Sequence, residues 1–90
     1  MSNYCNVLRS TILALGGGDQ ARAELIEVKK TGVEEIRFSW WSKDGKQFNL
    51  RPLDLPEEQW IELFELAVEN DVISQEFIKS MIKVLSQGLK

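Results

Sequence analysis

Histidine is absent from this chain, and cysteine occurs only once, at Cys5. Without histidine, one copy of the chain cannot form imidazole metal sites or the serine and cysteine nucleophiles that rely on a histidine base. A lone cysteine also excludes an internal disulfide, which is consistent with a reducing compartment. No spacing among the carboxylates matches a metal loop or a catalytic motif. We therefore expect a protein that is not an enzyme and that carries no metal and no cofactor.

The chain also lacks the usual signals of export and membrane insertion. Its N-terminus has no basic segment, and Arg9 interrupts the apolar stretch that follows, so we predict neither a signal peptide nor a membrane span. The net charge is −3 and the isoelectric point is near 4.9. This acidic balance argues against general binding to nucleic acids. The expected location is the cytoplasm, without a membrane partner.

What is present is an ordinary globular composition. Hydrophobic residues make up 43% of the 90-residue chain and charged residues 28%, which disfavours intrinsic disorder. No internal repeat or linker divides the sequence, and no motif assigns it to a family. We predict a single domain over residues 1–90, built around one core.

Residues 2–15 favour a helix at the N-terminus. Apolar side chains recur there at spacings of three and four, at Cys5, Leu8, Ile12 and Leu15. This spacing is the pattern of one helix face. The glycines at 16–18 then end the predicted helix, because glycine weakens a helix interior and readily takes positive φ at a helix end.

The middle of the chain predicts an antiparallel meander of three strands. Residues 23–30 are ambiguous alone, because their composition favours a helix while Ile26 and Val28 alternate as in a strand. Two short segments, residues 30–32 and 43–45, both end in glycine. This is typical of three-residue hairpin loops, whose third residue takes a left-handed conformation. The loops therefore favour strands on either side of them.

These two loops predict the registers of the strands. The expected opposite pairs are Val28 with Glu34, Ile26 with Ile36, Trp40 with Phe48, and Phe38 with Leu50. Apolar residues mostly face each other in these pairs, as cross-strand packing requires. A two-residue loop at 44–45 would instead pair Trp41 with Phe48 and scatter the apolar residues, so we favour the longer loop. The predicted core face of the sheet consists of Ile26, Val28, Ile36, Phe38, Trp40, Phe48 and Leu50.

Two helices are predicted after the sheet. Pro56 is placed as a first-turn proline, and the helix it begins should run to about Asn70. Ser74 is the expected N-cap of a second helix that ends at Gly88. The apolar stripes are Trp60, Leu63, Phe64 and Ala67 on the first helix, and Phe77, Ile78, Met81, Ile82 and Leu85 on the second.

The element order α-β-β-β-α-α predicts an α+β fold. We expect a three-stranded antiparallel meander with a C-terminal helical hairpin packed on one face.

A row of glutamates is the first candidate binding surface. Glu58, Glu62, Glu65 and Glu69 follow one another at spacings of four, three and four, which aligns them along one side of a helix. We call these four residues the glutamate ridge. A solvated surface is the default interpretation, since like charges at this spacing cost only about 0.2 to 0.5 kcal/mol per pair. The alternative is a docking strip for a basic partner, and Lys79 and Lys83 would neutralise the ridge if the helical hairpin brought them close.

The outer face of the sheet around Trp41 is the second candidate surface. The predicted registers place Arg37, Arg51, Gln47 and Asn49 on the same face. Such a group of side chains can stack on and hydrogen-bond a nucleic-acid base, or serve as a hot spot in a protein interface. We consider three alternatives for what covers the Trp41 indole. In order of preference, these are the predicted helix at 2–15, a second protein subunit, and nucleic acid.

Together these patterns favour a small non-enzymatic interaction module with a regulatory or inhibitory role. It would act through the Trp41 face or the glutamate ridge, and would bind a protein partner or a second copy of itself, as in a homodimer. The alternative is a single-stranded nucleic-acid-binding protein that uses Trp41, Arg37 and Arg51.

Overall fold

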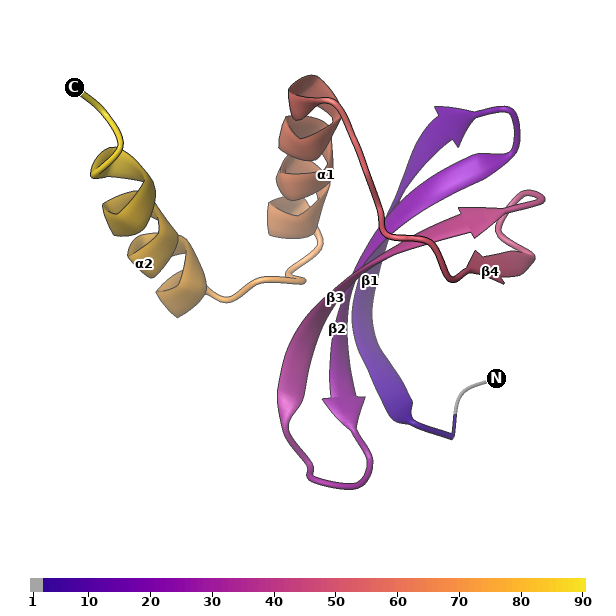
Figure 1. Cartoon of the computed structure of the whole chain (residues 1–90). Coiled ribbons are helices and arrows are strands. Elements are labelled where there is room, and N and C mark those ends of the chain that lie inside the picture. The colour runs from indigo at the N-terminus through magenta and orange to yellow at the C-terminus, as the bar shows by residue number, and fades with distance from the viewer. Residues whose placement is uncertain (1–2) are drawn as a thin grey trace.

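The computed structural model describes residues 3–90 and has an α+β fold, as the sequence predicts. Four antiparallel strands form one open sheet in the order β1-β2-β3-β4, and two helices follow (Figure 1). The strands are β1 Cys5–Gly16, β2 Asp19–Val28, β3 Glu34–Ser42 and β4 Gln47–Asn49, and the helices are α1 Glu57–Glu69 and α2 Gln75–Ser86. The predicted meander of three strands is thus extended by a fourth.

The added strand is β1, so the predicted N-terminal helix at 2–15 is wrong. Residue 2, where that helix was to begin, lies outside the described residues. β1 pairs with β2 from Cys5 to Gly16, and Gly17 and Gly18 form the tight turn between them. All three glycines have positive φ, from 63° to 91°, a conformation that only glycine adopts without strain. Because Gly16 pairs with Asp19, these glycines follow a strand rather than a helix.

The hairpin between β2 and β3 is one residue out of the predicted register. Leu25 lies opposite Ile36 and Ile26 opposite Glu35, whereas the sequence pattern paired Ile26 with Ile36. Val28 donates its backbone N–H to the carbonyl of Val33 over 2.9 Å. The loop therefore spans residues 29–32 instead of 30–32. This shift by one residue moves Ile26 and Val28 to the face opposite Ile36.

The hairpin between β3 and β4 also differs from the prediction. Trp41 lies opposite Phe48, and Trp40 lies opposite Asn49, which is the register of a two-residue turn. Asp44 and Gly45 form that turn with φ of 57° and 84°, as a type I′ hairpin turn requires. Phe48 therefore leaves the predicted core face and is 45% exposed.

The core lies between one face of the sheet and α1. On the sheet side its centre is formed by Ala21 and Ala23, which are completely buried, with Ile36 and Phe38 beside them. Small side chains at this point let a helix approach the sheet closely. Of the other predicted core residues, Trp40 lies opposite Ala21 on this same face, as predicted, whereas Ile26 and Val28 are buried on the far face and Leu50 is 90% exposed.

Helix α1 rests on β1 and β2. Leu63 and Ala67 are completely buried against the sheet alanines. At its C-terminal end, the Asn70 amide donates to the hydroxyl of Thr11 over 3.2 Å and to the carbonyl of Leu66 over 2.8 Å. This helix confirms the predicted span, and it covers one face of the sheet as expected.

Helix α2 does not cover the sheet, which corrects the prediction of a helical hairpin packed on one face. It contains no buried residue and stands on the far side of α1 from the sheet (Figure 1). Its beginning is as predicted, because the Ser74 hydroxyl accepts the backbone N–H of Phe77 over 3.1 Å. Within residues 3–90, neither helix is long and apolar enough to cross a membrane.

Candidate functional site

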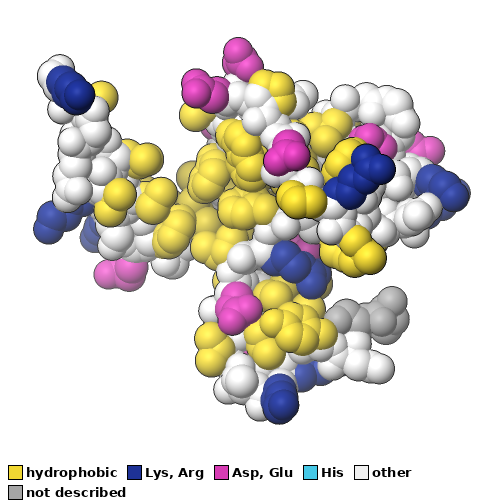
Figure 2. All heavy atoms as spheres, in the orientation of Figure 1, with side chains coloured by type: hydrophobic (Ala, Val, Ile, Leu, Met, Phe, Trp, Pro, Cys, Tyr) yellow, Lys and Arg dark blue, Asp and Glu magenta, His cyan; other side chains and the backbone are white. Residues whose placement is uncertain are grey.

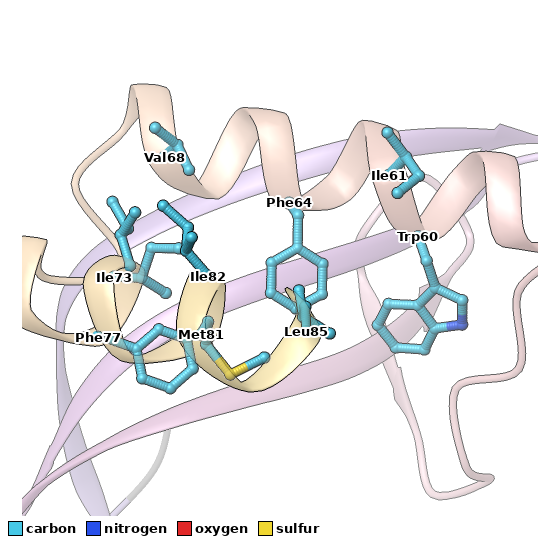
Figure 3. A pocket seen from close by; sticks show the side chains of 10 residues that line it. Trp60, Ile61, Phe64, Val68, Ile73, Phe77, Met81, Ile82 and Leu85 are labelled. Atoms are coloured by element: carbon cyan, nitrogen blue, oxygen red, sulfur yellow. The ribbon is translucent and has the colours of Figure 1, made fainter. Parts of the chain in front are cut away.

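An apolar groove of about 360 Å³ separates α1 from α2. Side chains from both helices point into it, and Ile73 of the connecting segment contributes to its lining (Figure 3). Every side chain that lines the groove is hydrophobic: Trp60, Ile61, Phe64 and Val68 of α1, Ile73, and Phe77, Ile78, Met81, Ile82 and Leu85 of α2. Such a lining offers contact area rather than catalytic groups.

The walls of the groove are exposed to an unusual degree. Ile61 is 63% exposed on α1, and Ile82 and Leu85 are 64% and 65% exposed on α2. Figure 2 shows the hydrophobic side chains as a continuous area between the two helices. Contiguous apolar surface of this kind marks interaction sites in soluble proteins.

The segment between the helices holds the groove open. Val72 is 1% exposed and Ile73 is 8% exposed, and Val72 donates its backbone N–H to the Ala67 carbonyl over 2.9 Å. Asp71 has a φ of 56°, a left-handed conformation that reverses the chain after α1. Because this segment is anchored in the core directly before Ser74, the direction of α2 is set by packing rather than by a free hinge.

The glutamate ridge borders the groove along α1. All four of its residues are exposed, as their spacing predicts. Glu65 lies four residues after Ile61 and three before Val68, so it neighbours both groove residues on the helix surface. The helix contains no lysine or arginine, so every charged side chain on it is acidic.

Lysines occur on the facing helix instead. Lys79 and Lys83 are exposed on α2, but within residues 3–90 neither lies within 4 Å of a ridge carboxylate. The structure therefore does not bring these lysines close enough to neutralise the ridge. The splayed position of α2 keeps the two sets of charges apart.

Trp41 is covered on the other face of the sheet, but not by an N-terminal helix. The guanidinium carbon of Arg22 lies 4.0 Å from the centre of the Trp41 ring, and the Phe48 ring packs against it edge-on at 5.3 Å. The indole nitrogen donates to the Ser39 hydroxyl over 2.9 Å. A cation–π contact and an aromatic pair thus use the surface that was predicted to receive a partner.

Arg37 forms an ion pair with Glu24 within the sheet. Its guanidinium donates to Glu24 over 2.8 and 3.0 Å, and to the Cys5 sulfur over 3.6 Å. The Glu24 side chain is only 5% exposed. Burial lowers the pKa of Arg37, but the hydrogen bond and the negative charge of Glu24 outweigh burial and raise that pKa above its ordinary value. Arg37 therefore faces Glu24 and not Arg51.

The remaining residues of the predicted Trp41 site lie elsewhere. Gln47 pairs with Ser42, and Asn49 pairs with Trp40, so both belong to the face opposite Trp41. Arg51 follows the end of β4 and is exposed. The structure therefore does not bring the five predicted residues together.

The two predicted apolar stripes contain seven of the ten residues that line the groove. The sequence pattern assigns both stripes to packing on the sheet. The additional apolar positions beside the α1 stripe, Ile61 and Val68, were the signal that this helix has a second contact surface.

Comparisons of the chain with models of protein families, with curated proteins and with solved structures find no match. The groove and its charged border therefore carry the functional argument.

Proposed function

We propose that this chain is a non-enzymatic interaction module that binds an amphipathic helix in the groove between α1 and α2. The observation that carries the proposal is the groove itself, whose lining is wholly hydrophobic and whose walls are exposed on both sides. Laying the apolar face of a helix into such a groove is a recurring mode of peptide recognition.

Burial of the groove walls supplies the affinity. Fully burying a Leu, Ile or Val side chain contributes about 1.5 to 3 kcal/mol. Ile61, Ile82 and Leu85 each have about two thirds of this surface still exposed, so covering each contributes roughly 1 to 2 kcal/mol before the entropy lost on binding.

The glutamate ridge supplies the selectivity. A partner helix in the groove passes beside exposed carboxylates on α1. Helix α1 itself carries no basic residue that could neutralise them. Lysine or arginine beside the partner's apolar stripe would be attracted, whereas acidic residues there would be repelled. The preferred ligand is therefore an amphipathic helix with basic residues on the side that faces α1.

The nucleic-acid alternative has lost its main support. Arg22 lies against the Trp41 ring and Arg37 is paired with Glu24, so neither side chain is free to stack on or contact a base without breaking these interactions. A cytoplasmic location, which we also propose, is supported by the buried free thiol of Cys5.

The proposal is tested with two synthetic helices that differ in charge. Both carry leucine on one face, and the other face carries lysine in one peptide and glutamate in the other. The readout is the NMR signal of each indole N–H, since Trp60 lines the groove and Trp41 lies on the far face of the sheet. We expect the lysine peptide to shift the Trp60 signal at concentrations that leave Trp41 unchanged, and the glutamate peptide to bind more weakly.

A matched pair of variants locates the binding. Ile61→Asp places a charge in the exposed groove wall, whereas Val33→Asp places one at a residue that is 52% exposed directly before β3. Ile61→Asp should abolish the Trp60 shift and Val33→Asp should preserve it. Equal shifts of Trp60 and Trp41, or no shift of Trp60 in a sample that has the mass of one chain, would refute the proposed function.

A further inference from the structure

We propose that the helix bound in this groove is α2 of a second copy of the chain. Two copies related by a two-fold axis would then each place α2 in the groove of the other. This inference rests on the proposed function and names its partner. In the resulting dimer, each α2 lies in the groove of the other copy, and the four helices form one bundle.

Helix α2 has the apolar face that the groove requires. Phe77, Met81 and Leu85 follow one another at spacings of four, and Ile82 widens the same stripe. None of the residues of α2 is buried. A helix of this length is marginal in water unless its apolar face is packed, so α2 gains stability from a second protein surface.

The charges of the two helices are complementary between copies. α1 carries the glutamate ridge and no basic residue, while α2 carries Lys79 and Lys83 on the side of Ile82. In a dimer these lysines reach the ridge of the other copy on their flexible stems. Within residues 3–90 of one copy the same groups form no ion pair, so both sets of charges are available for the contact.

The anchored connecting segment disfavours closure of α2 onto its own α1. Val72 and Ile73 are buried in the core, and Ser74 begins α2 immediately after them. Moving α2 against α1 would require the chain to change direction directly beside this anchored segment. Covering the groove with a second copy leaves the segment in place.

A charge exchange between two variants tests this dimer. One variant carries Glu65→Lys and Glu69→Lys on α1, and the other carries Lys79→Glu and Lys83→Glu on α2. Each variant alone places like charges along both contacts between copies, so its dissociation constant should rise at least about tenfold. Mixed in equal amounts, the two variants restore opposite charges at both contacts.

Sedimentation equilibrium provides the readout. We expect the wild type to have the mass of two chains, each variant alone to have the mass of one chain at the same concentration, and the mixture to regain the mass of two. Glu34→Lys with Glu35→Lys makes the same change in charge at exposed positions of β3 and should leave the dimer intact.

Failure of this inference can be distinguished from failure of the proposed function. A wild type that has the mass of one chain at all concentrations, or a dimer that both charge variants leave unchanged, overturns the exchange of α2. So does a mixture that stays monomeric. The titration with the lysine peptide then decides the proposed function separately: a selective Trp60 shift retains it, and the absence of that shift removes it as well.

Discussion

Leu63 and Ile82 lie on adjacent helices, yet the structure predicts different consequences when each is shortened to alanine. Leu63 is completely buried between α1 and the sheet, against Ala21 and Ala23. Ile82 is 64% exposed in the groove wall. Leu63→Ala should therefore lower the free energy of unfolding of a single copy, whereas Ile82→Ala should mainly weaken the proposed contact between copies.

The expected loss for Leu63→Ala is about 3 to 4 kcal/mol. Buried leucine truncations cost roughly 2 to 5 kcal/mol, and the cost is greater where the site cannot collapse around the cavity. The alanines beneath Leu63 are too short to fill the space, and they belong to a strand that is paired on both sides. A chain of this length is stable by only roughly 5 to 13 kcal/mol, so the melting temperature should fall by roughly 12 to 30 °C.

Urea denaturation at low protein concentration measures this effect, with far-ultraviolet circular dichroism as the signal. Under these conditions Ile82→Ala should change the free energy of unfolding by less than about 0.5 kcal/mol. At higher concentration the wild-type melting temperature should rise, because association stabilises the folded state. Ile82→Ala should reduce that rise, and Leu63→Ala should lower the melting temperature at every concentration.

A loss below about 1 kcal/mol for Leu63→Ala would refute the placement of this side chain at the centre of the core. An equal loss for both variants at low concentration would refute the distinction between a core face and a groove face of the helices. Either result would remove the physical basis of the groove as a surface left for a partner.

Three further substitutions probe individual contacts. Glu24→Gln removes the buried charge that pairs with Arg37, and urea denaturation should show a loss of roughly 1.5 to 3 kcal/mol. Gly45→Ala adds a Cβ 2.6 Å from the Arg22 guanidinium at a φ of 84°, and the melting temperature should report a loss of about 1 to 2 kcal/mol. Ser74→Ala removes the cap of α2, which should cost about 1 kcal/mol and reduce the protection of α2 amides in hydrogen exchange.

Matched controls separate these contacts from general effects. Glu35→Gln changes an exposed residue of β3 and should leave the free energy of unfolding nearly unchanged. If it lowered that free energy as much as Glu24→Gln does, the ion pair between Glu24 and Arg37 would not explain the effect. Gly32 also has positive φ, but a Cβ there meets nothing within 4 Å. If Gly32→Ala cost as much as Gly45→Ala, the contact with Arg22 would contribute nothing. Ser74→Thr keeps the hydroxyl and should retain the protection of α2.

The C-terminal half of the fold follows from local sequence signals. Pro56 precedes α1 directly, and the hydroxyl of Ser74 caps α2 as predicted. Both helices have apolar stripes at regular spacing. Such signals are strong because capping, charge and periodicity act within a few residues of one another.

The N-terminal strand was missed because its alternation is interrupted. A bulge between Val7 and Arg9 shifts the pairing of β1 with β2, so the residues that face the core change parity along the strand. The apolar residues that remain happen to recur at spacings of three and four. The extended conformation of this segment follows from its pairing with β2. Most of these pairs join residues that are far apart in the sequence, so a local pattern does not predict them.

The predicted strand registers are wrong because the two turn segments do not by themselves decide between loop lengths. Both turn segments fit more than one loop length. What selects the observed register is the packing of α1, which requires Ala21 and Ala23 beneath Leu63 and Ala67. Since α1 was predicted but its contact residues on the sheet were not, sequence patterns favoured the register that maximised apolar pairs.

The place of α2 depends on the segment between the helices. Its sequence contains two apolar residues, Val72 and Ile73, which local patterns do not distinguish from a simple turn. Their burial fixes the direction of α2 and leaves the groove open. The candidate site was therefore predictable as two apolar stripes, but not as an unfilled space between them.

The account is tested most directly by asking which copy of the chain contributes the side chains that meet in the groove. A sample mixed from isotope-labelled and unlabelled chains allows NMR to detect contacts between copies alone. The account predicts such contacts between the Ile61 methyl groups of one copy and the Ile82 methyl groups of another. Contacts between these residues found only within one copy, or no contacts between copies, would contradict it.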